Sequence, residues 1–205
     1  MAGTAMKGRE AIFAAIQARQ LAQSARPAPY KAPETEGDLG EAFAKRLSKQ
    51  GVDVRMLDSM RSVPAAILDI LRKHNMAARI HIPPDSSVAH FDLSKLEIRQ
   101  EPPGAFDAAV TFASYAIAET GTLVYAAGKG MPASWHFRPL LEIAIVRADA
   151  FVALFEDVLT VLHTKGGLPS TLNLVSGPSL TGDIEQSREV GAHGPKFLAA
   201  LILRS

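Results

Sequence analysis

The segment Glu142-Ile143-Ala144-Ile145-Val146 is the most informative stretch for the fold, because it is continuously apolar after its first residue. A strand with one face in water alternates polar and apolar residues, whereas a strand in a parallel sheet covered on both faces does not. The segment therefore predicts a buried strand within a parallel sheet. Further strands are expected over residues 52–57, 78–82, 96–99, 107–112, 117–125, 171–175 and 197–203.

Helical segments lie between several of these strands. Asp38 can cap a helix over 38–50, and Pro64 lies in the first turn of a helix over 62–75. Asp149 is expected to cap a third helix, in which apolar residues recur at helical spacing. Alternating strands and helices predict an α/β fold, a three-layer sandwich with a mostly parallel central sheet. Ligand sites in such folds lie beyond the carboxyl ends of the strands.

The beginning of the chain differs from the rest. Residues 6–23 have the alanine-rich, apolar-periodic pattern of a helix, and residues 24–37 contain Pro27, Pro29 and Pro33, which exclude a helix there. We therefore divide the chain into an N-terminal helical arm with a Pro-rich linker, residues 1–37, and an α/β domain, residues 38–205.

The composition excludes several classes of function. With 22 Lys and Arg against 21 Asp and Glu, the net charge is +1, without the basic excess expected of a nucleic-acid binder. The chain has no cysteine, so it cannot form a disulfide or ligate an iron–sulfur cluster through thiolates, and another subunit would have to supply such a redox centre. No apolar stretch approaches the ~20 residues of a membrane span and no signal-peptide core is present, so we expect a cytoplasmic protein.

Glu119-Thr120-Gly121-Thr122 interrupts the apolar run 116–125. A carboxylate within an apolar segment needs a partner or a ligand, because desolvation of its charge is costly. Gly121 would let a substrate approach the backbone, with Thr120 and Thr122 as binding groups and Glu119 as a general base or acyl acceptor. The alternative is a structural Glu119, held by backbone N–H groups or by an arginine such as Arg138.

A second polar segment, Ser176-Gly177-Pro178-Ser179, follows a predicted strand near the end of the chain. Its hydroxyls and amides, together with Thr181, Asp183 and Glu185, are candidates for binding an anion beside a helix N-terminus. The alternative is a turn and a capped helix, because Asp183 begins a capping-box pattern. We expect this segment and the Glu119 segment to converge.

His193 and Lys129 are the remaining candidates. His193, within Gly191-Ala192-His193-Gly194-Pro195, could act as acid and base near neutral pH, or it could be structural. Lys129, in the loop Gly128-Lys129-Gly130, offers a cation to a small acid or is simply solvated. No metal site is assigned, because no standard ligand spacing occurs. We expect the other histidines to be surface or packed residues: His74, His81, His90, His136 and His163.

These spaced motifs resemble the LUD (lactate utilisation) domain family, specifically the lactate utilisation protein C group. The resemblance rests on Ala116-Ile117-Ala118-Glu119-Thr120-Gly121-Thr122-Leu123, Ser176-Gly177-Pro178-Ser179, and Asp183-Ile184-Glu185 ahead of Gly191-Ala192-His193-Gly194-Pro195, and it spans roughly residues 38–205. It implies a fold similar to the superfamily of glucosamine-6-phosphate deaminase, ribose-5-phosphate isomerase and CoA transferases. It also implies that the chain acts together with iron–sulfur partner proteins in the oxidation of L-lactate to pyruvate.

Three positions depart from the family pattern. An acidic residue, a histidine and an alanine are expected where Ser114, Glu142 and Gly182 stand. These departures make a divergent member with a different substrate an open alternative.

The sequence thus favours a subunit of a lactate utilisation system that binds a small organic anion, with iron–sulfur clusters in partner subunits and no cofactor of its own. One alternative is an independent enzyme acting on a CoA thioester or sugar phosphate through Glu119, since CoA transferases use a glutamate in a similar Glu-x-Gly context. Another is a noncatalytic scaffold that docks through residues 1–37. The sequence leaves open whether the chain forms a homo-oligomer.

Overall fold

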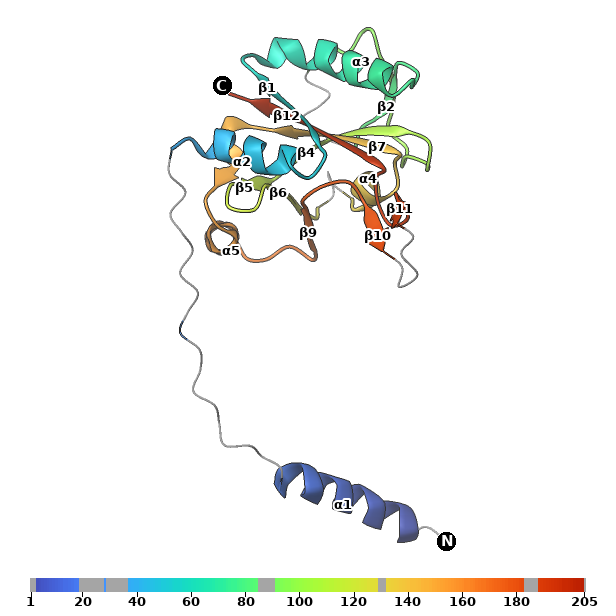
Figure 1. Cartoon of the computed structure of the whole chain (residues 1–205), viewed down its shortest axis with the longest axis vertical. Helices are drawn as coiled ribbons and strands as arrows, with labels where there is room; N and C mark the ends of the chain where they lie inside the picture. The colour runs from blue at the N-terminus through green and yellow to red at the C-terminus, as the bar shows by residue number, and fades with distance from the viewer. Residues whose placement is uncertain are drawn as a thin grey trace. The chain divides into compact units, whose positions relative to one another are not determined.

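The computed structural model describes residues 3–18, 28, 37–84, 91–128, 132–182 and 188–204. The chain divides into two units, Met1–Pro33 and Glu34–Ser205. In the first unit the structure describes α1 (Gly3–Ala18), on which Ile12, Phe13 and Ile16 are exposed (Figure 1). The predicted N-terminal helix is therefore present. Residues 19–23 and nearly all of the proposed linker lie outside the described residues, so the boundary at residue 37 stays a prediction.

A central sheet of six parallel strands forms the core of the second unit. Its order is β1 (Asp53–Leu57), β12 (Phe197–Leu203), β7 (Leu141–Val146), β4 (Ala108–Phe112), β2 (Arg79–His81) and β3 (Glu97–Arg99) (Figure 1). Every residue of β7 is buried, as its apolar sequence predicts. The predicted α/β fold with a mostly parallel central sheet is confirmed.

One face of the central sheet is covered by α3 (Val63–Lys73). Val63, Ile67 and Ile70 of this helix are fully buried and belong to one apolar cluster with Ile143 and Ile145 of β7. Burial of a large aliphatic side chain contributes roughly 1.5–3 kcal/mol, so this layer is a main source of stability.

The opposite face carries α2 (Leu39–Ser48) and a second sheet. The second sheet has four strands, in the order β8 (Phe151–Val152), β5 (Tyr115–Ile117), β6 (Thr122–Ala126) and β9 (Leu172–Val175). Phe43 and Leu47 of α2 are fully buried in a cluster that includes residues of both sheets. Asp38 caps α2 as predicted, because its carboxylate accepts the Glu41 N–H at 2.8 Å.

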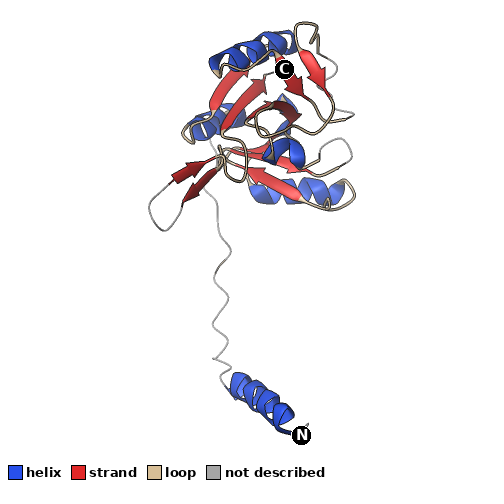
Figure 2. Ribbon diagram, turned by 90° about the vertical axis from the view of Figure 1, so that its right-hand side faces the viewer, coloured by secondary structure: helices blue, strands red, loops and turns tan. Residues whose placement is uncertain are grey.

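The outer face of the second sheet is covered by α5 (Phe155–Thr164). Val158 and Leu162 of this helix pack with Ile117 of β5 and Val124 of β6. Helices and sheets therefore form successive layers from α3 to α5, which Figures 1 and 2 show from two directions. The predicted sandwich is correct for α3 and the central sheet, but the layer on the other face contains a second sheet beside α2, and α5 adds a further layer.

The segment 117–125 forms a hairpin turn and its return strand, and not the single strand expected from its apolar character. β5 ends at Ile117, residues 118–121 form a turn, and β6 runs back antiparallel to β5. Gly121 permits this turn: its φ is +67°, and its N–H donates to the Ile117 carbonyl at 3.0 Å. Glu119 therefore lies half-buried in a turn, whereas a central strand would have buried it.

The helix predicted after Asp149 begins later than expected. Asp149 forms an ion pair with Arg147 across a 3₁₀ turn, with a shortest distance of 3.0 Å. The carboxylate of Asp157 instead caps α5, because it accepts the Leu154 N–H at 2.9 Å. The prediction that Asp149 caps this helix is therefore wrong.

The remaining elements connect the two sheets. A short helix, α4 (Ser134–Phe137), precedes β7, and a hairpin of β10 (Leu180–Gly182) and β11 (Arg188–Val190) precedes β12. Among the residues that the structure describes, no helix has the length and apolar character needed to cross a membrane.

We expect Gly121→Ala to lower the free energy of unfolding by about 2 kcal/mol or more, because alanine disfavours this left-handed backbone and has no room. An added Cβ would lie 2.7 Å from the Leu47 nitrogen and 2.9 Å from Arg46 Cβ. Gly128→Ala is the matched control: a Cβ there meets nothing within 4 Å, and its effect should stay within about 0.5 kcal/mol. Urea denaturation measures the free energy of unfolding of both variants. Equal stability of the two would contradict this account of the turn.

Candidate functional site

The two polar segments singled out from the sequence meet at one edge of the second sheet. β6 and β9 pair with Leu123 opposite Val175, so Thr122 adjoins Ser176, and their hydroxyl oxygens are 2.7 Å apart. The Thr120 hydroxyl lies 2.6 Å from that of Thr122. We call these side chains, Thr120, Thr122 and Ser176, the hydroxyl cluster. The segments converge as expected, but in the second sheet and not at the carboxyl edge of the central sheet.

The C-terminal half of α2 lies against the two segments. Gly121 packs on the α2 backbone at Leu47. Gly177 packs on Gln50, just beyond the helix, where an added Cβ would lie 3.1 Å from Gln50 Cβ. Side chains larger than hydrogen would hold both segments away from α2, so the two glycines allow this close packing.

A guanidinium group reaches the same turn. Arg46 Nη1 donates to the Ala118 carbonyl at 3.0 Å, and Arg46 is partly buried. Thr122 is buried, whereas Thr120 and Ser176 are exposed, so the linked hydroxyls lead from the interior to the surface. Hydroxyls can donate or accept a hydrogen bond and a guanidinium donates several, so this edge has the groups needed to bind a carboxylate.

Glu119 adjoins the hydroxyl cluster in the chain. Its backbone N–H donates to the Ala153 carbonyl at 3.1 Å, which fixes the turn to the segment that leads into α5. The residue is half-buried, so its carboxylate is neither sealed inside the protein nor fully solvated.

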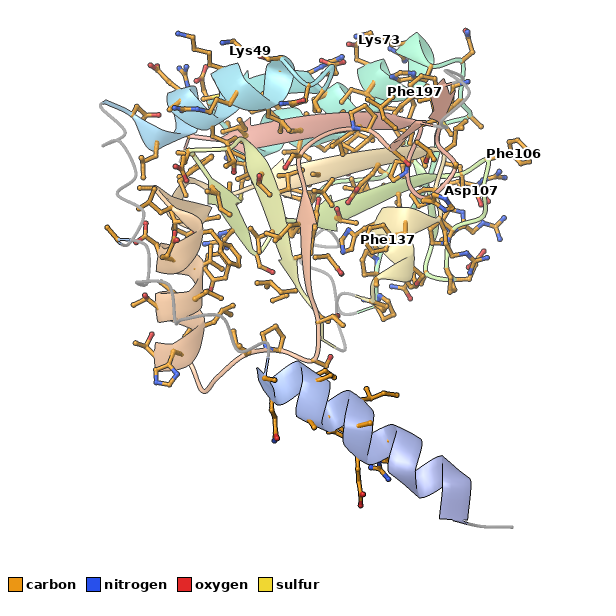
Figure 3. The ribbon with its side chains drawn as sticks, turned by 60° about the horizontal axis from the view of Figure 1, so that its bottom comes forward. Lys49, Lys73, Phe106, Asp107, Phe137 and Phe197 are labelled. Carbon is orange, nitrogen blue, oxygen red and sulfur yellow. The ribbon has the colours of Figure 1, made fainter. Side chains whose placement is uncertain are left out.

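Ser179 and His193 form a separate group, which we call the Ser179 group. The Ser179 hydroxyl accepts the His193 backbone N–H at 3.3 Å. Ser179 also donates its N–H to the Pro195 carbonyl and accepts the Gly191 N–H, both at 2.9 Å. His193 is exposed. Its hydrogen bond to Pro195 places Ser179 near the amino end of β12, which begins at Phe197, labelled in Figure 3.

The other candidates lie in or next to β10 in the chain, or directly after residue 128. Thr181 lies in β10 opposite Glu189, so it is a strand residue. Lys129, Asp183 and Glu185 lie outside the described residues, as does the start of the helix predicted at Asp183.

A group of polar side chains that the sequence did not reveal lies between the two sheets. Glu142 Oε1 accepts the Thr111 hydroxyl at 2.9 Å and the His136 Nδ1–H at 2.8 Å. The His136 ring stacks on Tyr125, with their centroids 3.7 Å apart. All four residues are fully buried. We call them the buried cluster.

The buried cluster connects β4, β7, α4 and β6, to which Thr111, Glu142, His136 and Tyr125 belong. Burial raises the pKa of Tyr125 well above its usual value, and the charge of Glu142 raises it further, so the phenol stays protonated at neutral pH. The cluster is fully buried, so its hydrogen bonds and ring contact hold together the elements to which its residues belong.

Several polar atoms of the buried cluster have no hydrogen-bond partner among the described residues. They are Tyr125 Oη, His136 Nε2 and Glu142 Oε2. Trp135 Nε1, next to His136 in α4, has no partner among these residues either.

The sequence contains one signal for this cluster. A lone carboxylate at the start of an apolar strand needs partners, so the reasoning applied to Glu119 applies with more force to Glu142.

These features define a class: an α/β protein with a parallel central sheet and a smaller second sheet whose edge is lined with hydroxyls. The sequence profile of the LUD domain family matches residues 40–203. The chain therefore belongs to the LUD domain family, as its motifs suggest.

Three relatives illustrate the similarity. Lactate utilization protein C of Halalkalibacterium halodurans is 41% identical over 93 residues, which is 43% of this chain and 40% of that relative, so the match spans about two fifths of the relative's length. Lactate utilization protein C of Deinococcus radiodurans is 28% identical over 185 residues, covering 86% of this chain and 85% of the relative. The crystal structure of a DUF162 family protein from Deinococcus radiodurans has a similar fold, with a TM-score of 0.64, 21% identity, and coverage of 83% of this chain and 99% of that one.

We expect the Glu142–His136 pair to behave as a unit in a double-mutant cycle. His136→Phe should lower the free energy of unfolding by about 3–5 kcal/mol, because it leaves a buried carboxylate without its cationic or N–H partner. Glu142→Leu should lower it by about 1–3 kcal/mol, through the imidazole left unpaired. The double variant should lose less than the sum of the two, with a coupling of about 1 kcal/mol or more.

Guanidinium denaturation measures each variant of this cycle. Asp149→Asn, which disrupts the exposed ion pair with Arg147, is the control. Its free energy of unfolding should stay close to that of the wild type. Strictly additive effects of His136→Phe and Glu142→Leu would show that the pair is not coupled.

Proposed function

We propose that this chain serves in lactate utilisation, as a subunit of a system that oxidises L-lactate to pyruvate. The observation that carries the proposal is the similarity to lactate utilization protein C of Deinococcus radiodurans over 86% of this chain and 85% of that relative. Membership of the LUD domain family supports the same role.

The proposed partners are iron–sulfur proteins. Oxidation of lactate to pyruvate releases electrons and protons, and an acceptor must take the electrons. Because the chain has no cysteine, a cluster ligated by thiolates would belong to another subunit. The proposed location is the cytoplasm.

The hydroxyl cluster is the proposed site for a small organic anion. Thr122 Oγ1 lies between the hydroxyls of Thr120 and Ser176, at 2.6 and 2.7 Å. Two of these hydroxyl residues are exposed, and Arg46 adds a partly buried guanidinium near the same turn. Hydrogen bonds from hydroxyls and a guanidinium to a carboxylate are charge-assisted, which favours an anion at this edge.

Glu119 is the proposed base, because it adjoins Thr120 and is only half-buried. Ser179 and His193, which form the separate Ser179 group, remain sequence-based candidates. Lys129, Asp183 and Glu185 remain sequence-based candidates. A relation to the superfold of glucosamine-6-phosphate deaminase and the CoA transferases is also proposed, on the resemblance of the motifs.

We expect Thr122→Val and Ser176→Ala each to weaken binding of L-lactate by about tenfold and to impair lactate-dependent growth of a strain that lacks its own copy of the chain. Valine suits a β-strand as well as threonine does, so β6 should survive the loss of the hydroxyl. Ser170→Ala removes a serine hydroxyl outside the cluster and is the matched control. Isothermal titration calorimetry and growth on lactate as the carbon source are the measurements.

Other roles would give different results in the same experiments. Unchanged growth in both cluster variants, with growth lost on deletion of residues 1–37, would replace the proposal with a noncatalytic scaffold. Hydroxylamine trapping of a glutamyl adduct at Glu119 after incubation with an acyl-CoA would replace it with an independent CoA-thioester enzyme.

A further inference from the structure

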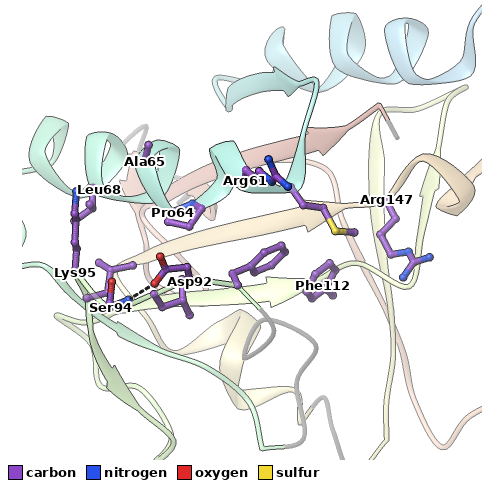
Figure 4. Close-up of a pocket in the computed structure, with 13 residues that line it drawn as sticks. Arg61, Pro64, Ala65, Leu68, Asp92, Ser94, Lys95, Phe112 and Arg147 are labelled. Atoms are coloured by element: carbon purple, nitrogen blue, oxygen red, sulfur yellow. Dashed lines mark hydrogen bonds between the residues drawn. The ribbon is translucent and has the colours of Figure 1, made fainter.

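A pocket separate from the hydroxyl cluster lies at the carboxyl edge of the central sheet (Figure 4). Its volume is about 680 Å³, and it lies between α3 and the segment 91–96, which precedes β3. Arg61 follows β1, Phe112 ends β4 and Arg147 follows β7, so three parallel strands bring their carboxyl ends to it. Ligands of open α/β sheets bind at this edge, because the loops that follow the strands gather there.

The body of the pocket is apolar. Leu68 of α3 and Leu93 and Leu96 of the segment 91–96 line it, and Leu68 packs against the apolar cluster that contains the other two. Phe91 and Phe112 add two nearly parallel rings, with planes 18° apart and centroids separated by 6.0 Å. Aromatic and aliphatic walls of this kind favour a planar, apolar ligand body, which can stack on a ring face or lie against the aliphatic side chains.

The rim of the pocket is cationic. Arg61 and Arg147 stand toward one end and Lys95 toward the other, as Figure 4 shows. Among the described lining residues, Asp92 is the sole carboxylate. Arg147 binds Asp149 through Nε and Nη2, at 3.0 Å each. No ion pair engages the side chain of Arg61 within the part of the chain that the structure describes, so its guanidinium is available to a ligand.

We propose that this pocket binds an organic anion with a planar ring, such as an aromatic carboxylate or a nucleotide. The volume falls in the range of roughly 300–1,000 Å³ that is typical of pockets for drug-sized ligands, and lactate would fill only a small part of it. The ring of the ligand lies on Phe112 and Leu68, and its carboxylate or phosphate forms a charge-assisted hydrogen bond with Arg61. This inference does not depend on the lactate role, because it uses a different part of the molecule.

The test is isothermal titration of the full chain in low-salt buffer with 2-naphthoate, AMP, 2-naphthamide and L-lactate. We expect 2-naphthoate or AMP to bind, and uncharged 2-naphthamide to bind more weakly than 2-naphthoate. Arg61→Glu should weaken binding of the ring-bearing anion by about tenfold or more, through loss of attraction and added repulsion. Tighter binding of 2-naphthoate would identify the ligand class as aromatic carboxylates, and tighter binding of AMP would identify it as nucleotides.

Arg72→Glu is the matched control, because it makes the same charge change on α3 at an exposed residue that does not line the pocket. It should bind as the wild type does. Arg61→Glu places a carboxylate just before α3, where the helix dipole favours negative charge, so its fold should persist, and thermal unfolding checks this.

Three results would overturn the proposal. They are the absence of binding by both 2-naphthoate and AMP, equal binding by 2-naphthamide and 2-naphthoate, and equal loss of binding in Arg61→Glu and Arg72→Glu. A change in L-lactate binding alone would bear on the hydroxyl cluster and not on this pocket.

Discussion

The carboxylate of Glu142 is sealed between the central sheet and the second sheet, and hydrogen bonds from Thr111 and His136 hold it there. A buried charge without partners would cost the fold several kcal/mol, so these hydrogen bonds constrain how the layers meet. Tyr125 of β6 stacks on the His136 ring, so this contact also restricts the position of the second sheet. The position of β6 in turn fixes the hairpin turn and the hydroxyls of the proposed anion site.

The two proposed sites occupy different surroundings. The hydroxyl cluster lies at an edge of the second sheet beside α2, with a chain of short hydrogen bonds and one partly buried guanidinium. The pocket at the carboxyl edge of the central sheet is lined with apolar side chains and has cations on its rim. A small polar acid suits the first, and a larger anion with a ring suits the second. The two proposed sites share no side chain.

The parallel central sheet could be predicted from sequence, because a strand that is buried on both faces has an almost continuously apolar sequence, as β7 does. The hairpin around Glu119 could not be predicted in the same way. Its flanks are apolar on both sides, and the turn depends on a positive φ at Gly121 and on close packing with Leu47, which joins residues far apart in the chain. The two polar segments converge as expected, and the cause is the pairing of β6 with β9 in the second sheet, which the sequence did not reveal.

Side chains that meet only through tertiary structure were also missed. Thr111 and Glu142 are 31 residues apart and meet because β4 and β7 are neighbours. His136 was expected only to be a surface or packed residue, and its hydrogen bond to Glu142 depends on how α4 packs on the sheet. Arg61, Lys95 and Arg147 share no motif. Arg61 and Arg147 follow strands that end at a common edge, and Lys95 reaches the same pocket from the segment before β3.

The most direct test of the central claim is a titration of the full chain with L-lactate, followed residue by residue through its backbone amide signals in heteronuclear NMR spectra. If the buried cluster positions an anion site at the edge of the second sheet, the amides of Gly121, Thr122, Ser176 and Gly177 will shift and saturate together. Saturable shifts confined to the carboxyl edge of the central sheet, or none at these four residues, would contradict the account.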